Sequence, residues 1–289
     1  MSELGDNITS FHFHESLLLD LSHFSDELRV AALAAQVGGK IVNGYFDSGV
    51  TSIGKTLNDR PQGLVTKADL ESEASIVACI RESYPHHHFL GEETYSDDIH
   101  NEHLWIIDPL DGTNNFAFGI PRFAVSVAYY RKGVPHSGAI LDPVSGTMSV
   151  AEKGRGAFSG NQKAGVSQHN QLSDTMISTG FYYDRGVMMQ TTLDTIRDLF
   201  HENIHGIRRF GAAALDLVDV GMGRYGGFFE YVLSPWDFAA ARIFIEEAGG
   251  RVTDCLGNPL GLEKTSVLAT NGKLHEVLLK ITSKHVGKS

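Results

Sequence analysis

The chain has 289 residues, of which 42% are hydrophobic, so it can bury a large core as one layered domain or as two closely joined halves. Its 35 acidic and 24 basic residues give a net charge of -11, which argues against nucleic acid as a primary partner. Its 2 cysteines are too few for a disulfide framework, which fits a reducing, cytoplasmic location.

The first patterned segment is residues 10–24, SFHFHESLLLDLSHF, which we predict to form a short leader helix. It lacks a basic segment ahead of its apolar run, and Asp20 and Ser22 interrupt that run, so we expect neither a signal peptide nor a membrane span. From Ser25 onward a longer helix is predicted, with small residues inside its apolar stripe, which is typical of close helix packing. The stripe consists of Leu28, Ala31, Ala32, Ala35, Gly39, Val42 and Phe46.

Two apolar runs in the first half of the chain are predicted to be strands that end in acidic residues. Residues 89–90 are followed by Gly-Glu-Glu, which places Glu92 shortly after the first strand. Residues 105–107, Trp-Ile-Ile, are typical of a buried strand and deliver Asp108 and Asp111 into a turn. The two strand ends therefore present carboxylates.

The turn after the second of these strands is rich in backbone donors. Pro109 cannot continue a central ladder, so we expect the strand to end before it, and Gly112 lets the backbone approach a ligand closely. Asp108 and Asp111, with the carbonyl of Leu110 between them, supply the oxygen ligands that Mg²⁺, Mn²⁺ or Ca²⁺ prefer. Taken alone, the Asp-Gly pair also fits an ordinary turn.

Two clusters of basic side chains have alternative interpretations. The consecutive histidines His86, His87 and His88 can offer ligands to a borderline metal, but three neighbours in a regular element do not face one ion, and a solvated loop is favoured. Arg208 and Arg209 fit contact with a second phosphate or a neighbouring subunit, and equally a charged strand edge.

The remaining elements mix strands and helices without repeats. Strands are predicted over residues 124–130, 137–141 and 228–230, short strands and turns over 154–160, and helices over 187–201, 212–220 and onward from 235. The last helix places Asp237 in its first turn, where the helix dipole favours an acid. Runs of strands followed by runs of helices indicate an α+β fold in layers rather than a regular βαβ winding.

Three segments, in this order and spacing, carry a resemblance to a known family. They are GEE at 91–93, DPLDGTNNF at 108–116 and PWDFAAARIFIEEAGG at 235–250. From about Lys55 to its end the chain resembles the inositol monophosphatase family, which are Mg²⁺-dependent, lithium-sensitive sugar phosphatases. The resemblance implies a layered αβαβα sandwich and a homodimer. It also implies a single domain over 1–289, with most metal ligands in an N-terminal half of about 1–170 and the substrate contacts in a C-terminal half of about 171–289.

The resemblance implies two or three Mg²⁺ ions in the site. Glu92, Asp108 and the carbonyl of Leu110 would hold the first ion, and Asp108, Asp111 and Asp237 would share the second. A third, weaker ion would lean on Glu92. Two ions of this kind can lower the pKa of an attacking water and stabilise the leaving oxygen of an in-line displacement.

The catalytic and substrate-binding roles are implied in the same way. Asp69 would orient Thr113, and Thr113 with Glu92 would position and deprotonate the attacking water. A route through a phosphoaspartate is the mechanistic alternative. The residues implied to contact substrate are Asp111, Gly112 and Thr113 around the phosphate, and Gly211, Ala212, Ala213, Glu230 and Asp237 around the polyol.

The preferred substrate is myo-inositol monophosphate, because Glu230 lies where the family has its inositol-contacting acid. An acid accepts hydrogen bonds from a polyol and repels a second anion, which argues against fructose bisphosphate and adenosine 3',5'-bisphosphate. Histidinol phosphate stays open, since its ammonium group can pair with Glu230. An alternative of another class is a regulatory binding protein that keeps the fold and engages the transcription or translation machinery.

Overall fold

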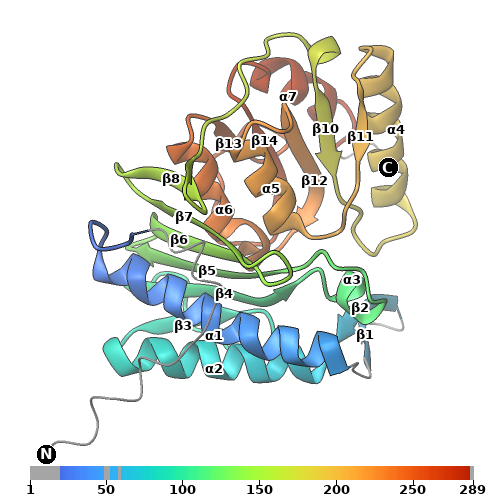
Figure 1. The fold of residues 1–289 in the computed structure, drawn as a ribbon. Coiled ribbons are helices and arrows are strands. Elements are labelled where there is room, and N and C mark those ends of the chain that lie inside the picture. The colour runs from blue at the N-terminus through green and yellow to red at the C-terminus, as the bar shows by residue number, and fades with distance from the viewer. Residues whose placement is uncertain (1–19, 49–52, 58–59, 287–289) are drawn as a thin grey trace, which may run out of the picture.

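A computed structural model describes residues 20–48, 53–57 and 60–286 and arranges them in layers (Figure 1). Helices α1 and α2 form one outer layer, followed by a seven-stranded sheet, then α5 and α6, then a five-stranded sheet, with α4 and α7 outside it. This is the predicted αβαβα sandwich.

The helices and strands alternate along the chain without a repeating unit. The helices are α1 (Asp26–Ser48), α2 (Lys67–Ser83), α3 (Thr113–Ala117), α4 (Val187–His201), α5 (Ala213–Gly221), α6 (Pro235–Glu247) and α7 (His275–Ser283), with a 3-10 turn at Leu172–Asp174. The strands of the seven-stranded sheet are β3 (His88–Gly91), β4 (His103–Asp111), β5 (Ala124–Arg131), β6 (Val134–Asp142), β7 (Thr147–Glu152), β8 (Gly156–Ser159) and β9 (Gln162–Lys163). The remaining strands are the pair β1 (Ile53–Leu57) and β2 (Arg60–Val65), and β10 (Met176–Thr179), β11 (Gly206–Arg208), β12 (Gly227–Leu233), β13 (Arg251–Thr253) and β14 (Thr265–Thr270).

The two large sheets differ in strand direction. The seven-stranded sheet follows chain order from β3 to β9; its first pair is parallel and the pairs after it are antiparallel. The five-stranded sheet has the order β11-β10-β12-β14-β13, and β10 pairs with β11 and β12 in parallel. Because no single winding generates both sheets, the fold is α+β, as predicted.

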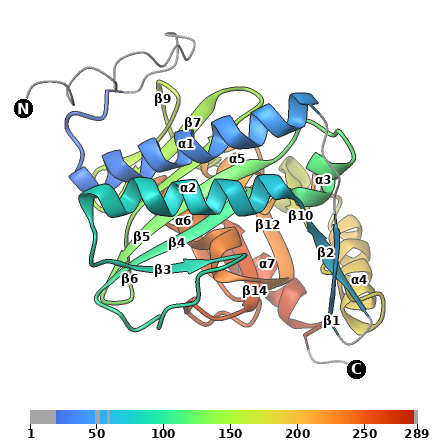
Figure 2. The same cartoon turned by 90° about the horizontal axis from the view of Figure 1, so that it is seen from below.

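The stripe of small residues on α1 packs against α2 and the sheet beneath it. A Cβ built on Gly38 would lie 2.7 Å from Ile76 Cδ1, and one built on Gly39 would lie 2.4 Å from Leu141 Cδ2. Figure 2 shows the two helices side by side across one face of the sheet. The stripe is therefore a packing surface, as the sequence indicated.

Strand β4 separates two hydrophobic cores. Leu104 and Ile106 face the core shared with α5 and α6, while Trp105 and Ile107 face the core under α1 and α2. All four side chains are almost completely buried, which a strand with apolar residues on both faces requires. The period of two sends successive residues to opposite layers.

The prediction that this strand ends before Pro109 is wrong. Strand β4 continues to Asp111, and its pairing with β5 shifts register between Asp108 and Asp111. Such an irregularity removes Pro109 from the regular ladder, so its missing N–H costs no hydrogen bond. The bulge turns both aspartates to the end of the sheet.

The predicted solvated loop at the three histidines is only partly correct. His86 is exposed and His88 begins β3, but His87 is half-buried and its ring stacks on His103 at 4.4 Å between centroids. Trp105 Nε1 donates a hydrogen bond to His87 Nδ1 at 3.0 Å. Burial, with His103 nearby, lowers the pKa of His87 to about 4, so the ring is a neutral part of an aromatic cluster.

Other predictions of local structure agree with the fold. Helix α4 has the predicted bounds, and α5, α6, β5, β6 and β12 lie where the sequence placed them. Residues 10–19 of the predicted leader helix lie outside the described residues, and 20–24 form a turn rather than a helix. Within the described ranges, no helix combines the length and apolar character that crossing a membrane requires.

Candidate active site

Three carboxylates converge where the seven-stranded sheet meets the central helices. Asp108 and Asp111 come from the bulged end of β4, and Asp237 comes from the first turn of α6. One oxygen of each lies within 4.8 Å of an oxygen of the other two. Asp108 and Asp111 are buried and Asp237 is half-buried, so three acids share a small volume with little water.

Burial and mutual repulsion oppose the ionisation of these three carboxylates. Asp108 Oδ1 accepts a hydrogen bond from the amide of Leu110 at 3.0 Å, but its buried Oδ2 has no hydrogen-bond partner within the part of the chain that the structure describes. Burial, then the nearby charges of Glu92 and Asp111, raise the pKa of Asp108 well above its ordinary value. Oxygen donors with this crowding fit a hard divalent cation, which would restore their ionised forms.

The pKa values of the other two carboxylates are raised as well. Burial raises the pKa of Asp111 to about 7, and burial together with the charge of Asp111 raises the pKa of Asp237 to about 7. Backbone amides hold both side chains in place. Ala213 and Ala214 donate to Asp111 at 3.1 and 2.8 Å, and Ser234 donates to Asp237 Oδ2 at 2.7 Å. Each carboxylate is thus oriented by the first turn of a helix.

Thr113 and Asp69 are joined in a second polar group beside this cluster. The Thr113 hydroxyl lies 3.2 Å from Asp69 Oδ1 and 3.0 Å from the carbonyl of Leu110, and it can donate its proton to either. Asp69 is fully buried in the first turn of α2, where Thr66 donates to its Oδ2 from both the amide and the hydroxyl. The predicted pairing of Asp69 with Thr113 is therefore seen in the structure.

Glu92 lies in the bend after β3, over a buried acid of α2. The amide of Glu93 donates to Glu73 Oε1 at 3.1 Å, and Glu73 is completely buried. A Cβ on Gly91 would lie 2.0 Å from the same oxygen, so the chain runs directly against Glu73. This contact fixes the bend from which Glu92 reaches the cavity.

One cavity of about 330 Å³ collects these groups. All eleven predicted site residues other than Asp69 line this cavity: Glu92, Asp108, Leu110, Asp111, Gly112, Thr113, Gly211, Ala212, Ala213, Glu230 and Asp237. Asp69 lies behind Thr113, as expected for an orienting group. The side chain of Lys55 lies outside the described residues.

The turn at Gly112 explains why a glycine stands there. Its φ is 91°, and a Cβ would approach the carbonyl oxygens of Arg122 and Gly211 to 3.2 Å each. A side chain would be strained in this conformation and would crowd the wall of the cavity. The backbone of the Asp-Gly-Thr turn is thereby open to a ligand on its other side.

Several residues of the cavity wall were missed by the sequence analysis. Tyr182, Tyr183 and Arg185 follow β10, and Lys264 precedes β14. Lys264 Nζ donates to the Tyr182 hydroxyl at 3.0 Å. No local spacing distinguishes these loop residues from ordinary surface residues, whereas the arginine pair at 208–209 had been noted: Arg209 lines the cavity and Arg208 ends the edge strand β11.

Glu230 forms the far wall of the cavity and sits against a glycine. Its carboxylate is buried, and burial, followed by the charge of Asp237, raises its pKa well above the ordinary value. A Cβ on Gly180 would lie 1.9 Å from Glu230 Oε2. The absence of a side chain at Gly180 is what leaves room for this acid.

On the expectation that Glu230 contacts a polyol phosphate, Gly180→Ala should raise the KM about tenfold and change kcat less, because the displaced carboxylate would lose a hydrogen bond to the substrate. Steady-state kinetics would measure this. Gly44→Ala is the matched control, since a Cβ on Gly44 in α1 meets no atom within 4 Å. An unchanged KM in Gly180→Ala would show that Glu230 does not contact the substrate.

The layered fold and the all-oxygen cluster define a class of protein, the metal-dependent phosphatases of small phosphate esters. A family profile described as "Inositol monophosphatase family" matches residues 25–286. The chain belongs to the inositol monophosphatase family. Membership supports a phosphatase that depends on a metal.

Individual relatives agree with this assignment. The chain is 38% identical over 263 residues to "Putative Nus factor SuhB" of Neisseria meningitidis serogroup B, covering 90% of this chain and 98% of the relative. It is 37% identical over 258 residues to "Inositol-1-monophosphatase" of Mesorhizobium japonicum, covering 89% and 96%. The crystal structure of inositol monophosphatase from Anabaena superposes with a TM-score of 0.79 at 37% identity, covering 90% of this chain and 96% of that one.

Proposed function

We propose that the protein is a Mg²⁺-dependent phosphomonoesterase that hydrolyses myo-inositol monophosphate to inositol and phosphate. The observation that carries the proposal is the approach of Asp108, Asp111 and Asp237 to within 4.8 Å in a cavity that also holds Thr113 and Glu230. Oxygen ligands without cysteine favour Mg²⁺ over softer ions. The same cavity thus contains groups for the phosphate and for a polyol.

The metal ligands on this proposal are Glu92, Asp108, Asp111, Asp237 and the carbonyl of Leu110. Divalent cations held there would neutralise charge on the phosphoryl oxygens and stabilise the leaving alkoxide. The burial of Asp108 makes the site dry enough for such charges to act strongly. Its buried Oδ2, which accepts no hydrogen bond from the described residues, would be available to bind such a cation.

Thr113 and Asp69 position the attacking water. When the Thr113 hydroxyl donates to Asp69 Oδ1 at 3.2 Å, its lone pairs are left to accept a hydrogen bond from a water in the cavity. On this proposal Glu92, which lines the same cavity, takes up the proton that the water loses as it attacks. The backbone of Gly112 and Thr113 faces the phosphate, and water attacks opposite the leaving oxygen.

The polyol end of the substrate lies against Glu230 and the segment from Gly211 to Ala213. Because burial raises the pKa of Glu230, its protonated form can both donate to and accept from hydroxyl groups. That environment favours a neutral polyol over the ammonium group of histidinol phosphate, which needs an ionised partner. Histidinol phosphate is therefore the second substrate to test.

Phosphate release from a panel of esters tests the proposal. The panel contains inositol 1-phosphate, histidinol phosphate, fructose 1,6-bisphosphate, adenosine 3',5'-bisphosphate and NADP, each with Mg²⁺ and with a chelator. We expect release that requires Mg²⁺ and is fastest with inositol 1-phosphate. A higher kcat/KM for another ester would overturn the substrate, and activity that persists in chelator would overturn the metal-dependent mechanism.

A second candidate function is a regulatory binding role alongside catalysis. The relative from Neisseria meningitidis is named a Nus factor, which favours this candidate. Asp108→Asn separates the two roles, because binding through the surface should persist when catalysis is lost. Equal recovery of one identified partner by the unaltered protein and by this variant, measured in a pull-down, is the expected result.

A further inference from the structure

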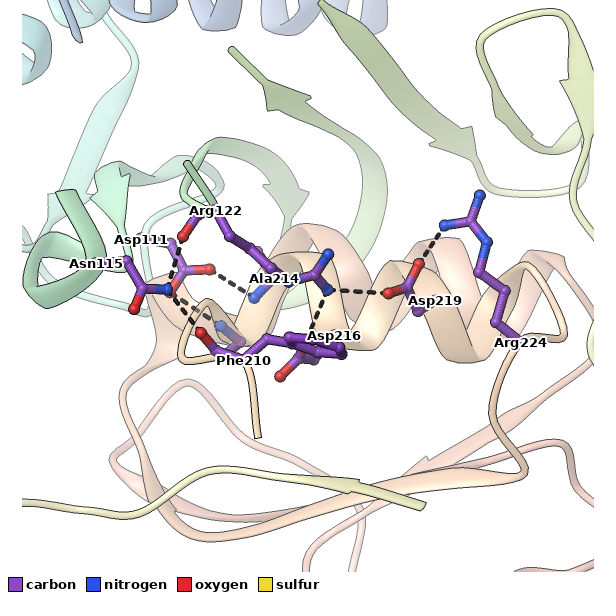
Figure 3. A network of polar contacts seen from close by, with 9 residues as sticks. Asp111, Asn115, Arg122, Phe210, Ala214, Asp216, Asp219 and Arg224 are labelled. Atoms are coloured by element: carbon purple, nitrogen blue, oxygen red, sulfur yellow. Dashed lines mark hydrogen bonds and ion pairs between the residues drawn. The ribbon is translucent and has the colours of Figure 1, made fainter. Parts of the chain in front are cut away.

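Arg122 joins two parts of the chain that are far apart in sequence. It precedes β5, and its Nη2 donates to Asp216 Oδ1 at 2.7 Å and to Asp219 Oδ2 at 2.9 Å (Figure 3). Both acids belong to α5 and their side chains are buried, with 2% and 7% exposed, while Arg122 keeps 26%. A single guanidinium nitrogen thus bridges two acids that lie three residues apart on one helix.

Two further contacts hold the segment before α5. The Arg122 guanidinium lies over the Phe210 ring, 4.5 Å from its centroid. Asn115 Nδ2 donates to the carbonyl of Arg122 at 2.8 Å and to the carbonyl of Phe210 at 2.7 Å. The chain entering α5 is therefore fastened to the chain between α3 and β5 at both backbone and side chain (Figure 3).

The segment held by these contacts leads into backbone amides that hydrogen-bond to a predicted metal ligand, Asp111. The first amides of α5, from Ala213 and Ala214, are the donors that hold the Asp111 carboxylate. The chain around Gly112 is closely packed, because an added Cβ would lie 3.2 Å from atoms of Arg122, Gly211 and Ala212. A shift of α5 would therefore move the hydrogen-bond donors of Asp111.

The competing explanation is that the ion pairs of Arg122 only stabilise the fold. Arg224, in the same network, is an arginine for which we expect only that structural role. Arg224 also pairs with Asp219, but its side chain is 58% exposed and it follows the far end of α5. Among the described residues, no ion pair joins Arg224 to Asp216. The two arginines thus share a carboxylate, while Arg122 alone of the pair also contacts the start of the helix.

We propose that Arg122 is a positioning residue for the metal site: by bridging Asp216 and Asp219 it fixes α5 so that its first amides orient Asp111. The inference rests on the proposed function, because it takes Asp111 as a metal ligand. Partners of this kind that orient a ligand from behind typically change metal affinity by about 10- to 100-fold when removed. The effect should appear in metal binding, where overall loss of stability alone would not produce it.

The test compares Arg122→Met with Arg224→Met by calorimetric titration of the substrate-free proteins with Mg²⁺, together with thermal unfolding. We expect Arg122→Met to weaken Mg²⁺ binding about tenfold or more, and Arg224→Met to leave it unchanged although both remove a partner of Asp219. In Arg122→Met, activity at low Mg²⁺ should fall more than activity at saturating Mg²⁺. Arg122→Lys, which keeps the charge but loses the planar guanidinium over Phe210, should bind Mg²⁺ with intermediate affinity.

Unchanged Mg²⁺ affinity in a folded Arg122→Met would overturn the proposal, as would equal weakening in Arg224→Met. If Arg122→Met does not fold, the comparison of Arg122→Lys with the unaltered protein decides in the same way. Failure of the proposed function gives a different result: the unaltered protein would bind Mg²⁺ yet release no phosphate from the ester panel. In that case the calorimetric comparison still decides the role of Arg122.

Discussion

Asp108→Asn is expected to lower kcat/KM for phosphate release by about 10³-fold or more. Asp108 is the carboxylate that the proposed function places on both metal ions, and an asparagine offers a neutral oxygen in its place. A loss of roughly 4 kcal/mol of transition-state stabilisation, within the range expected for metal-ion catalysis, corresponds to that factor. Steady-state kinetics at saturating Mg²⁺ would measure it.

The same substitution should not weaken the fold. Asp108 is 1% exposed, and its pKa is raised chiefly by burial, so the metal-free protein holds an acid that resists ionisation. Asparagine removes the ionisable group, and its side-chain oxygen can still accept from the Leu110 amide. We expect an equal or higher unfolding temperature without metal. Asp174→Asn, at an exposed position outside the cavity, is the control for activity. Full activity in Asp108→Asn would refute the metal assignment.

The stabilisation of the protein by Mg²⁺ is expected to grow as the pH rises from about 4 to about 8. In the metal-free protein the pKa values of Asp111 and Asp237 are raised from 3.8 to about 7, with burial the largest cause. Between these values the folded state holds protons that the unfolded state has released. The stability these groups contribute is therefore fully present below pH 3.8 and is lost as the pH rises through about 7.

A bound divalent cation reverses this loss, because it holds the carboxylates ionised, and at low pH protons compete with it. Unfolding temperatures with excess Mg²⁺ and with chelator should thus diverge as the pH rises. The difference between the two curves is the useful quantity. Burial lowers the pKa of His87 and His275 to about 4, so the stability that these histidines contribute rises with pH, opposite to that of the two aspartates. Their contribution is the same with Mg²⁺ and with chelator, so it cancels in the difference between the two curves. Curves that stay parallel would contradict the metal site.

The parts of the fold that the sequence predicted are those with a local signal. Helix α4 repeats its apolar residues at helical spacing, and its bounds agree with the prediction. The place of Asp237 in a metal site was implied only by the resemblance, whereas Asp108 and Asp111 were predicted as oxygen ligands from the apolar run beside them. Such signals need only a few neighbouring residues.

The parts that were missed depend on contacts between distant residues. The bulge at Pro109 depends on the register of β4 against β5, and the neutral His87 depends on rings from β4 that stack on it. Arg122 and Asp216 are 94 residues apart, so no spacing in the sequence reveals their pairing. The role of Asp69 was implied only by the resemblance, since its helix-capping position has an ordinary explanation.

The cavity lies between two sheets, and each sheet contributes a different set of residues to its wall. Asp108, Asp111 and Thr113 come from the seven-stranded sheet and the turn after it, whereas Glu230 and the residues after β10 come from the five-stranded sheet. On the proposed function, changes in the second sheet would alter which leaving group fits, provided that β12 still delivers Asp237 of α6 to the other two aspartates. A gene duplicate of this chain could then diverge toward new esters chiefly through its second sheet.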